Sequence, residues 1–356
     1  MSSDGCGCSC ACAADGSRRP GRGQRLRVTL LALSLVLVAV VAAMRWERYL
    51  SQYPRASGVS VQPVEFLASD PLFDMTNALI PRDEILSGGP PKDGIPSITS
   101  PGHVPVSEFE LPPGERVIGI AIGGEEVAYP LALLNWHECV NDVVGGVPIA
   151  VTYCPLCDSV AVFDRRVGGE VIEFGISGRL YNSNVLLYDR RSVASEESLW
   201  SQLQGRAVTG TRAGADLETL PFELTPWGQW RDTHPNAKVV AFPDPAQRSY
   251  DRNPYERYFA DPENLMFPVQ PLDDRLGRKE RILGLAASGE STAVILDALS
   301  TGEHRIPIAG THVTVEWDSQ EDALRVNEIP EGVQAMHTFW FAWAAMHPET
   351  AITGRE

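Results

Sequence analysis

An internal similarity constrains the fold of this chain more than any other sequence feature. Residues 117–135 (VIGIAIGGEEVAYPLALLN) align with residues 282–300 (ILGLAASGESTAVILDALS) at a constant offset of 165. At an offset of 164, residues 146–154 lie over residues 310–318, and the spacing of tryptophan and histidine from Trp227 to Pro235 recurs from Trp340 to Pro348. A body that repeats its own pattern predicts two related folding units.

The two copies differ in length and in cysteine content. Cys154 precedes Trp227 by 73 residues, whereas the corresponding Asp318 precedes Trp340 by only 22 and no cysteine accompanies it. The first copy therefore carries about 51 extra residues (73 − 22). We expect residues 93–281 to form a first repeat whose inserted motif region holds the site, and residues 282–356 to form a degenerate second repeat.

Local patterns in the first copy predict mainly strands. Strand-like runs cover Val117–Ile122, Val127–Tyr129 and Val147–Tyr153, and helical spacing covers Leu131–Val140. The segments Val160–Asp164 and Val171–Phe174 flank Gly168-Gly169, which is typical of a β-hairpin. We expect an α+β fold, namely a β-rich globular domain built from two degenerate repeats, which a linker over residues 47–92 joins to the amino-terminal part.

The amino-terminal part contains an apolar run. Val28–Met44 has 17 residues without a charge, which just spans a hydrocarbon core of about 30 Å, and Trp46 and Tyr49 follow as in an interfacial belt. We predict a transmembrane signal anchor over residues 28–46, with residues 1–27 as a cytoplasmic tail because five arginines precede the run. A cleaved signal ending near Ala42-Ala43 is the alternative, and Arg18-Arg19 weakly resembles a twin-arginine signal.

Either alternative puts the body of the protein beyond the cell membrane. The whole chain has a formal charge of −16, of which residues 1–50 contribute +4, from seven arginines and three acidic residues. The remaining 306 residues therefore carry −20. An acidic body of this size repels a phosphate backbone, so we expect no nucleic-acid partner.

Seven cysteines fall into two groups. Four alternate with small residues in the tail, where they could bind a soft metal or have no role: Cys6, Cys8, Cys10 and Cys12. Three lie in the body: Cys139, Cys154 and Cys157. Outside the cytoplasm unprotected thiols oxidise, and an odd number leaves at least one unpaired within the domain unless a metal holds it.

The sequence Cys154-Pro155-Leu156-Cys157 is the sharpest local motif. Two thiols at this spacing after a strand suit a redox dithiol or half of a tetrahedral metal site. A thioredoxin-like fold is not favoured, because a hairpin pattern rather than a helix follows. His137 and Cys139 could complete a Cys₃His set, although a histidine at the end of a helix is often only a cap. A plain Cys154–Cys157 disulfide is the third possibility.

The inserted region contains a polar run over residues 174–184, FGISGRLYNSN. Arg179, Tyr181 and Asn182 would position a small-molecule substrate there. A hydrogen-bonded β-arch that fixes its own turns explains the same composition equally well.

Five phrases of the body, taken in order, resemble a known prokaryotic family of exported or membrane-tethered proteins, domain of unknown function 3179: AYPLALLNWHECVNDVVGG, VTYCPLCDSVAVFDR, FGISGRLYNSNVLLYDR, SLWSQLQG and TPWGQWRDTHP. The resemblance covers about residues 93–350 and implies no established activity. Cys139 stands where the family pattern usually has an aliphatic residue, which favours His137, Cys154 and Cys157 with a ligand from the insertion over the Cys₃His set. Asp158 stands where glycine is usual.

These observations predict a membrane-anchored, extracytoplasmic protein with a thiolate site that binds copper or zinc, or that is redox-active, beside a polar small-molecule pocket. Cys154 and Cys157 would be ligands, and His137 a third ligand or a proton carrier. Zinc would imply hydrolytic or purely structural use. The competing prediction is a non-catalytic envelope protein, either a metal carrier or a ligand-binding module, with a structural Cys154–Cys157 disulfide.

Overall fold

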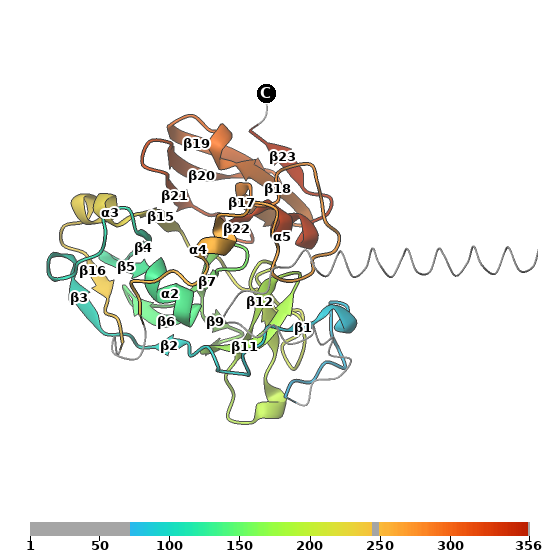
Figure 1. The fold of residues 1–356 in the computed structure, drawn as a ribbon. Helices are drawn as coiled ribbons and strands as arrows, with labels where there is room; N and C mark the ends of the chain where they lie inside the picture. The colour runs from blue at the N-terminus through green and yellow to red at the C-terminus, as the bar shows by residue number, and fades with distance from the viewer. Residues whose placement is uncertain (1–71, 244–248, 355–356) are drawn as a thin grey trace, which may run out of the picture. The chain divides into compact units, whose positions relative to one another are not determined.

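Strands dominate the computed structural model, which describes residues 72–243 and 249–354. These residues belong to one compact unit, Ala56–Glu356. The predicted signal anchor and the cysteine-containing tail lie outside the described ranges. Within those ranges, no helix has the length and apolar character needed to cross a membrane. The prediction of a β-rich domain with few helices is confirmed (Figure 1).

Two eight-stranded sheets form most of the fold. The first has the strand order β19 (Gly302–Ile308), β20 (Thr311–Asp318), β21 (Ala323–Glu328), β15 (Phe222–Pro226), β4 (Arg116–Ile122), β5 (Glu125–Pro130), β16 (Lys238–Val240) and β3 (His103–Pro105). The second has the order β2 (Ile98–Thr99), β6 (Cys139–Val144), β7 (Val147–Cys154), β8 (Ser159–Asp164), β22 (Gln334–Phe339), β17 (Arg281–Ala287), β18 (Glu290–Ile295) and β23 (Ala351–Thr353).

Each of these sheets combines strands from both halves of the chain. Strands β19–β21 join the first sheet through the β21–β15 pair, and β6–β8 join the second through the β8–β22 pair. Apolar side chains from both sheets, such as Ile118, Val151 and Leu283, share one core. The halves therefore depend on each other for strand pairing and for burial of their apolar faces.

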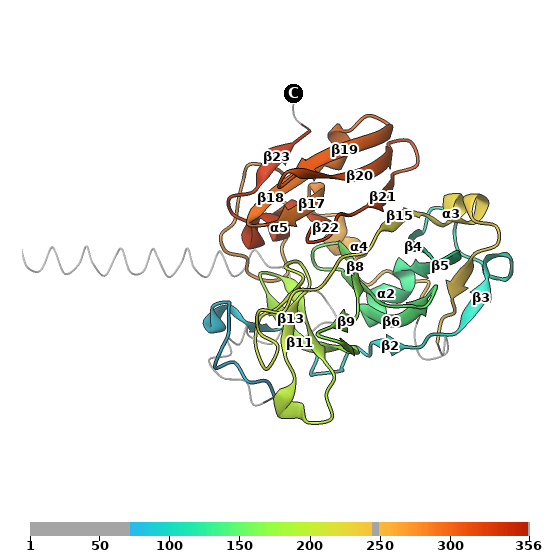
Figure 2. The same ribbon diagram turned by 180° about the vertical axis from the view of Figure 1, so that it is seen from behind.

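A third, five-stranded sheet has the order β1 (Leu86–Ser87), β11 (Phe174–Tyr181), β12 (Asn184–Asp189), β13 (Leu199–Ser201) and β14 (Arg206–Ala207). Figure 2 shows it from the side on which β11 and β13 are seen. A small hairpin pairs β9 (Arg166–Val167) with β10 (Glu170–Val171). The five-stranded sheet contributes Phe174, Leu187 and Trp200 to a core that also contains all three cysteines of the body.

The helices of residues 72–243 and 249–354 are short. They are α2 (Leu131–His137), α3 (Trp227–Thr233), α4 (Glu256–Phe259) and α5 (Trp340–Met346), with single 3₁₀ turns at η1 (Arg82–Glu84), η2 (Val106–Glu108), η3 (Ala194–Glu196) and η4 (Leu296–Ala298). Helix α2 follows Pro130, and α3 follows Pro226. Proline fixes its own backbone and suits the start of a helix.

Two local predictions were wrong. The helix predicted over Leu131–Val140 ends at His137, because Glu138 adopts the left-handed conformation (φ 57°) and Cys139 begins strand β6. The predicted pairing of Val160–Asp164 with Val171–Phe174 does not occur, since β8 pairs with β7 and β22, and Gly168-Gly169 joins only β9 to β10. Phe174 instead begins β11.

Two glycines allow tryptophan side chains to pack directly on strands. A Cβ atom on Gly119 of β4 would lie 2.0 Å from the ring of Trp230, and one on Gly284 of β17 would lie 2.3 Å from the ring of Trp343. Each tryptophan also contacts a histidine four residues later, with ring centroids 3.8 Å apart for Trp230 and His234. The tryptophan and histidine spacing seen in the sequence thus belongs to the core.

Candidate functional site

The cysteine pair lies in the turn between β7 and β8. Cys154 is the last residue of β7, and the N–H of Cys157 donates to the carbonyl of Cys154 (3.3 Å). The residues are 1% and 0% exposed. Both are free thiols, as is the third described cysteine, Cys139. The turn therefore presents two neighbouring thiols inside the core.

Polar groups from the β11–β12 hairpin and from the start of β8 surround the two sulfur atoms. The Cys154 thiol lies 3.9 Å from the carbonyl oxygen of Ser183 and is within hydrogen-bond reach of Cys157. The side-chain amide of Asn184 donates to the Cys157 sulfur (3.1 Å), and Ser159 Oγ lies 3.2 Å from the same sulfur. The dithiol is therefore embedded in hydrogen bonds rather than in a purely apolar core.

The orientation of the Asn184 amide is fixed. Its Oδ1 accepts the N–H of Leu203 (3.2 Å), so Nδ2 must face Cys157. The same Nδ2 donates to Gln202 Oε1 (2.8 Å), which also accepts the Ser159 hydroxyl (2.5 Å). Because Ser159 has a single hydroxyl proton, it either donates to Gln202 and accepts from the Cys157 thiol, or turns toward a Cys157 thiolate.

The two thiols differ in acidity. Burial raises the pKa of Cys154 well above its usual value, and its hydrogen bond to Cys157 adds to this. Burial opposes ionisation of Cys157 too, but hydrogen bonds from Cys154, Ser159 and Asn184 outweigh burial and lower the pKa of Cys157. In this pair Cys154 therefore stays a thiol and donates a hydrogen bond to Cys157, which is the cysteine that ionises more readily.

Strand β22 fixes the turn from the carboxyl-terminal half of the chain. The carbonyl of Cys157 accepts the N–H of Phe339 (2.8 Å) and the hydroxyl of Thr338 (3.1 Å). His337 Nδ1 bonds the carbonyl of Asp158 (2.9 Å). These bonds join the cysteine turn to residues about 180 positions away in the sequence.

Asp158, in the left-handed conformation (φ 48°), anchors the turn electrostatically. Its carboxylate forms a bidentate pair with Arg116 (2.7 and 3.0 Å) and accepts the hydroxyl of Tyr153 (2.8 Å). Burial opposes ionisation of Asp158, yet Arg116, His337 and the hydrogen bonds outweigh it and lower the pKa. The buried carboxylate of Asp158 is therefore held by a fixed cation.

The hairpin between β11 and β12 brings its two-residue turn onto Cys154. Asn182 (φ 47°) and Ser183 (φ 62°) are both left-handed, which is a type I′ turn. Asn182 Oδ1 accepts the N–H of Gln270 (2.9 Å). Asn182 Nδ2 and Ser183 Oγ are buried and have no hydrogen-bond partner within the described part of the chain.

Glu138 is a further buried acid beside the pair. Its side chain is 6% exposed, and its charge lies near enough to Cys154 and Tyr255 to raise the pKa of both groups. In the described ranges no hydrogen bond or ion pair reaches its carboxyl group. Burial alone raises the pKa of Glu138 to about 8. Glu138 therefore binds a proton at neutral pH.

An irregular segment, residues 249–280, covers the cysteine turn. Helix α4 is its only regular element. Both ribbon views show α4 near β22 (Figures 1 and 2). The Tyr258 hydroxyl donates to the carbonyl of Leu156, inside the turn (2.5 Å), and Gln270 bonds Asn182. Lys279 lies over the Tyr258 ring, 3.4 Å from its centroid. Long irregular segments of this kind often form active-site covers.

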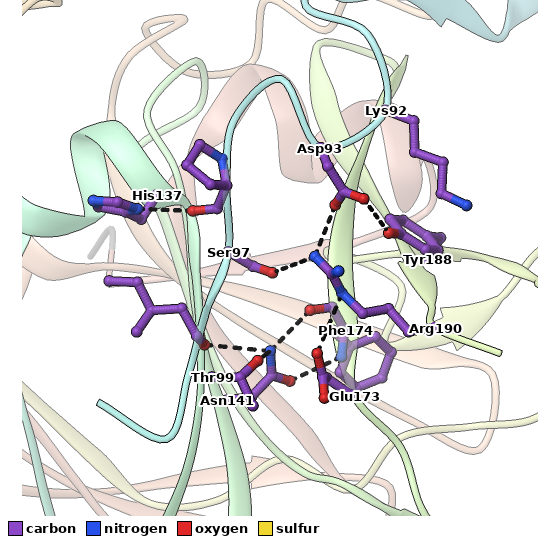
Figure 3. A network of polar contacts seen from close by, with 12 residues as sticks. Lys92, Asp93, Ser97, Thr99, His137, Asn141, Glu173, Phe174, Tyr188 and Arg190 are labelled. Carbon is purple, nitrogen blue, oxygen red and sulfur yellow. Dashed lines mark hydrogen bonds and ion pairs between the residues drawn. The ribbon is translucent and has the colours of Figure 1, made fainter. Parts of the chain in front are cut away.

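His137 forms hydrogen bonds within the protein through both ring nitrogens. Its Nδ1 bonds the carbonyl of Pro96 (2.7 Å) and its Nε2 bonds the hydroxyl of Tyr250 (2.8 Å), so both ring nitrogens already have oxygen partners. Figure 3 shows the Pro96 contact at the edge of a polar network. In that network Asp93 accepts from Arg190 and from Tyr188.

The other predicted site residues are placed as follows. Cys139 is in β6, and burial raises its pKa to about 12, so it stays a thiol. Tyr181 pairs with Asn184 across the hairpin, and Arg179, also in β11, pairs with Ser87 and Leu186. Among the described residues, no three or more histidine, cysteine or acidic side chains are grouped as metal ligands. The copper or zinc site therefore stays a prediction.

Several residues of the site were not identified from the sequence as its parts. Asn184 and Ser183 were seen only as members of a polar run, and Glu138 only as part of the phrase WHE. Ser159 and Gln202 lie 43 positions apart. The signal that points to them is their place in the family phrases, because Glu138, Ser159, Asn184 and Gln202 each lie in a different one of these phrases.

Comparison with known proteins identifies a family. A family model described as "Protein of unknown function (DUF3179)" matches residues 92–332, which is more than half of the chain. No curated protein and no solved structure matches the chain.

Proposed function

Because the chain belongs to the family of proteins of unknown function DUF3179, whose description names no activity, we propose its function from the cysteine pair: Cys154 and Cys157 form a two-electron redox centre. The observation that carries this proposal is the Asn184 amide, which donates to the Cys157 sulfur (3.1 Å) beside the Cys154 thiol. A donor aimed at one sulfur of a thiol pair stabilises the thiolate from which a disulfide forms.

The redox step is simple to balance. Two thiols lose two electrons and two protons, and one bond forms between Cys154 Sγ and Cys157 Sγ. The electrons pass to a two-electron acceptor, which in a laboratory test is oxidised dithiothreitol. The spacing of the cysteines in one turn keeps both sulfurs together in both states.

The test is a redox equilibrium. Full-length protein is incubated with mixtures of reduced and oxidised dithiothreitol and then alkylated. We expect two forms in equilibrium: a reduced form, in which the reagent alkylates Cys154 and Cys157, and an oxidised form, in which it alkylates two thiols fewer. Replacing either Cys154 or Cys157 by serine should abolish the interconversion, whereas Cys139→Ser should leave it intact. A protein whose cysteines never form the Cys154–Cys157 bond under these conditions would overturn the proposal.

Metal binding is the second candidate, because two sulfurs within hydrogen-bond reach suit a soft ion. Thiolates select copper(I), whereas a zinc site takes four ligands as a rule. His137, the expected third ligand, bonds two oxygen atoms of the protein instead. We expect Cys154→Ser to bind one equivalent of copper(I) less than wild type, while Cys139→Ser binds as much as wild type. No binding by the reduced protein would exclude this candidate.

We further propose that residues 28–46 tether this domain outside the cell membrane, with residues 1–27 in the cytoplasm. The uncharged run and the arginines that precede it support this topology. Protease added to intact cells should digest the domain of a tethered protein. Full protection of the domain would contradict it.

We also infer that the body arose by duplication. In one half β4 and β5 are flanked by β15 and β16, and in the other β17 and β18 are flanked by β22 and β23, with one parallel pair at the same place in each. The glycine and tryptophan contacts at Gly119 and Gly284 support the same alignment. Only the first copy has cysteines, which favours it as the functional half.

A further inference from the structure

The two-residue turn that contacts Cys154 has a sequence that is not optimal for its backbone conformation. Its two residues, Asn182 and Ser183, are left-handed. Asparagine followed by glycine is the preferred pair for such a turn, because only glycine adopts this conformation without strain. A serine with φ 62° is therefore a local compromise, and compromises of this kind concentrate at functional sites.

The same two residues leave hydrogen-bond donors unused. Ser183 is fully buried and Asn182 is 5% exposed, yet Ser183 Oγ and Asn182 Nδ2 have no partner among the described residues. The Asn182 amide cannot relieve this by turning over, because Gln270 N–H holds its Oδ1 (2.9 Å). Buried polar atoms without partners are rare in native proteins and each requires an explanation.

The unused donors belong to the dithiol site. The carbonyl of Ser183 lies 3.9 Å from the Cys154 sulfur, so the turn packs directly on the cysteine pair. The turn that carries the two unused donors therefore adjoins Cys154, and the oxygen atom of a substrate bound there would supply the acceptor that they lack.

Charge and access limit what that substrate can be. Asparagine and serine are neutral donors, and the two cations near the turn already have partners. Arg116 is paired with Asp158, and Lys279 donates to the carbonyls of Tyr258 and Asp261. A buried anion would therefore lack a counter-charge, which favours a neutral substrate. Because the cysteines are 1% and 0% exposed beneath residues 249–280, a small molecule reaches them with less rearrangement than a folded protein.

We propose that the site binds a small neutral sulfoxide, whose oxygen takes the hydrogen bonds that Asn182 Nδ2 and Ser183 Oγ lack, and that the cysteine pair reduces it. This inference rests on the proposed dithiol function. The sulfoxide sulfur gains two electrons, its bond to oxygen breaks, and the oxygen leaves as water with the two protons of the dithiol. The Cys154–Cys157 bond forms, and the thioether is released. A single turnover needs no other reductant.

The experiment is a single-turnover assay with methyl p-tolyl sulfoxide. Full-length protein is reduced, freed of reductant and mixed with the sulfoxide, and the sulfide is measured by chromatography together with the remaining thiols. We expect one sulfide for every two thiols lost. Free thiols reduce sulfoxides very slowly, so the Cys154→Ser protein gives the background rate.

Ser183→Gly is the decisive variant, because glycine suits the turn and should fold at least as well as serine. We expect sulfide formation to slow by at least about tenfold, as when one positioned donor is removed from an active site. Ser288→Gly is the matched control: Ser288 has φ 50° in the exposed turn between β17 and β18, and its replacement should leave the rate unchanged.

The outcomes separate this inference from the proposed function. If wild-type protein forms its disulfide with oxidised dithiothreitol but yields no sulfide, the substrate class is wrong and the redox centre stands. If no disulfide forms with either oxidant, the redox centre itself is wrong. Sulfide formation that is equally fast in Ser183→Gly would refute the role of the turn.

Discussion

The buried carboxyl group of Glu138 makes the stability of the protein depend on pH in a direction that one substitution isolates. Burial raises the pKa of this group from its ordinary value of 4.5 to about 8. In the unfolded chain the group ionises near its ordinary value. Between these two pH values the folded state retains a proton that the unfolded state has released, so stability falls as pH rises.

The size of the effect follows from the shift. Each pH unit between the two pKa values changes the free energy of unfolding by about 1.4 kcal/mol. A shift of 3.5 units (8 − 4.5) therefore corresponds to about 5 kcal/mol in total. Stability from this group is fully present below pH 4.5 and is lost as pH approaches 8.

Glu138→Gln keeps the shape of the side chain but has no proton to lose. From pH 5 to pH 8 we expect the variant to gain about 3–4 kcal/mol relative to wild type, because only wild type loses stability through this group. Burial lowers the pKa of His337 and His347 to about 4, which costs stability below pH 6.5. Both proteins contain these histidines, so their contribution cancels in the comparison.

The assay is urea unfolding of the full-length protein, followed by tryptophan fluorescence at four pH values between 5 and 8. Glu331→Gln, at an exposed position, is the control and should follow wild type at every pH. Parallel stability curves for wild type and Glu138→Gln would refute the reasoning, since they would mean that Glu138 ionises in the folded protein as it does in water.

Three further predictions concern the same fold. Asn184→Ala removes a donor to the Cys157 sulfur and should raise the pKa of that thiol by roughly one to two units, measured by thiolate absorbance at 240 nm; an unchanged pKa would contradict the assigned contact. Tyr258→Phe removes one hydrogen bond of the cover, worth about 1 kcal/mol, and should speed alkylation of the dithiol about fivefold in native buffer but not in urea. Gly284→Ala would place a Cβ 2.3 Å from the Trp343 ring and should lower the free energy of unfolding by about 1–3 kcal/mol; an unaltered urea midpoint would show that the ring moves freely.

Local sequence patterns predicted the β-rich character of the fold and several of its strands. Strand β4, the later part of β5 and most of β7 lie where strand-like runs indicated strands, because most residues of these strands are buried in the core. The end of α2 was not predictable in the same way. Cys139 and Val140, the last residues of the predicted helix, instead begin strand β6. The left-handed Glu138 ends the helix, and β6 then pairs with β7.

The candidate site was only partly accessible to sequence reasoning. Cys154 and Cys157 were identified because their spacing is itself a signal. Asn184 was not assigned to the cysteines, since 27 residues separate it from Cys157 and it lies in another sheet, so only tertiary packing brings the two residues together. Residues 249–280 have no periodic pattern, so nothing local indicated that Tyr258 would reach the cysteine turn.

Because each of the two large sheets combines strands from both halves of the chain, the protein should be divisible into two pieces that complement each other. A cut after Leu272, which is 40% exposed, would separate β8 and β15 from their neighbours β22 and β21. Each piece would then carry open sheet edges that the other piece pairs. Because Phe339 and Thr338 hold the Cys157 carbonyl, only the reassembled pair would restore the dithiol, which would make its redox chemistry a readout of whether two fused partners have met.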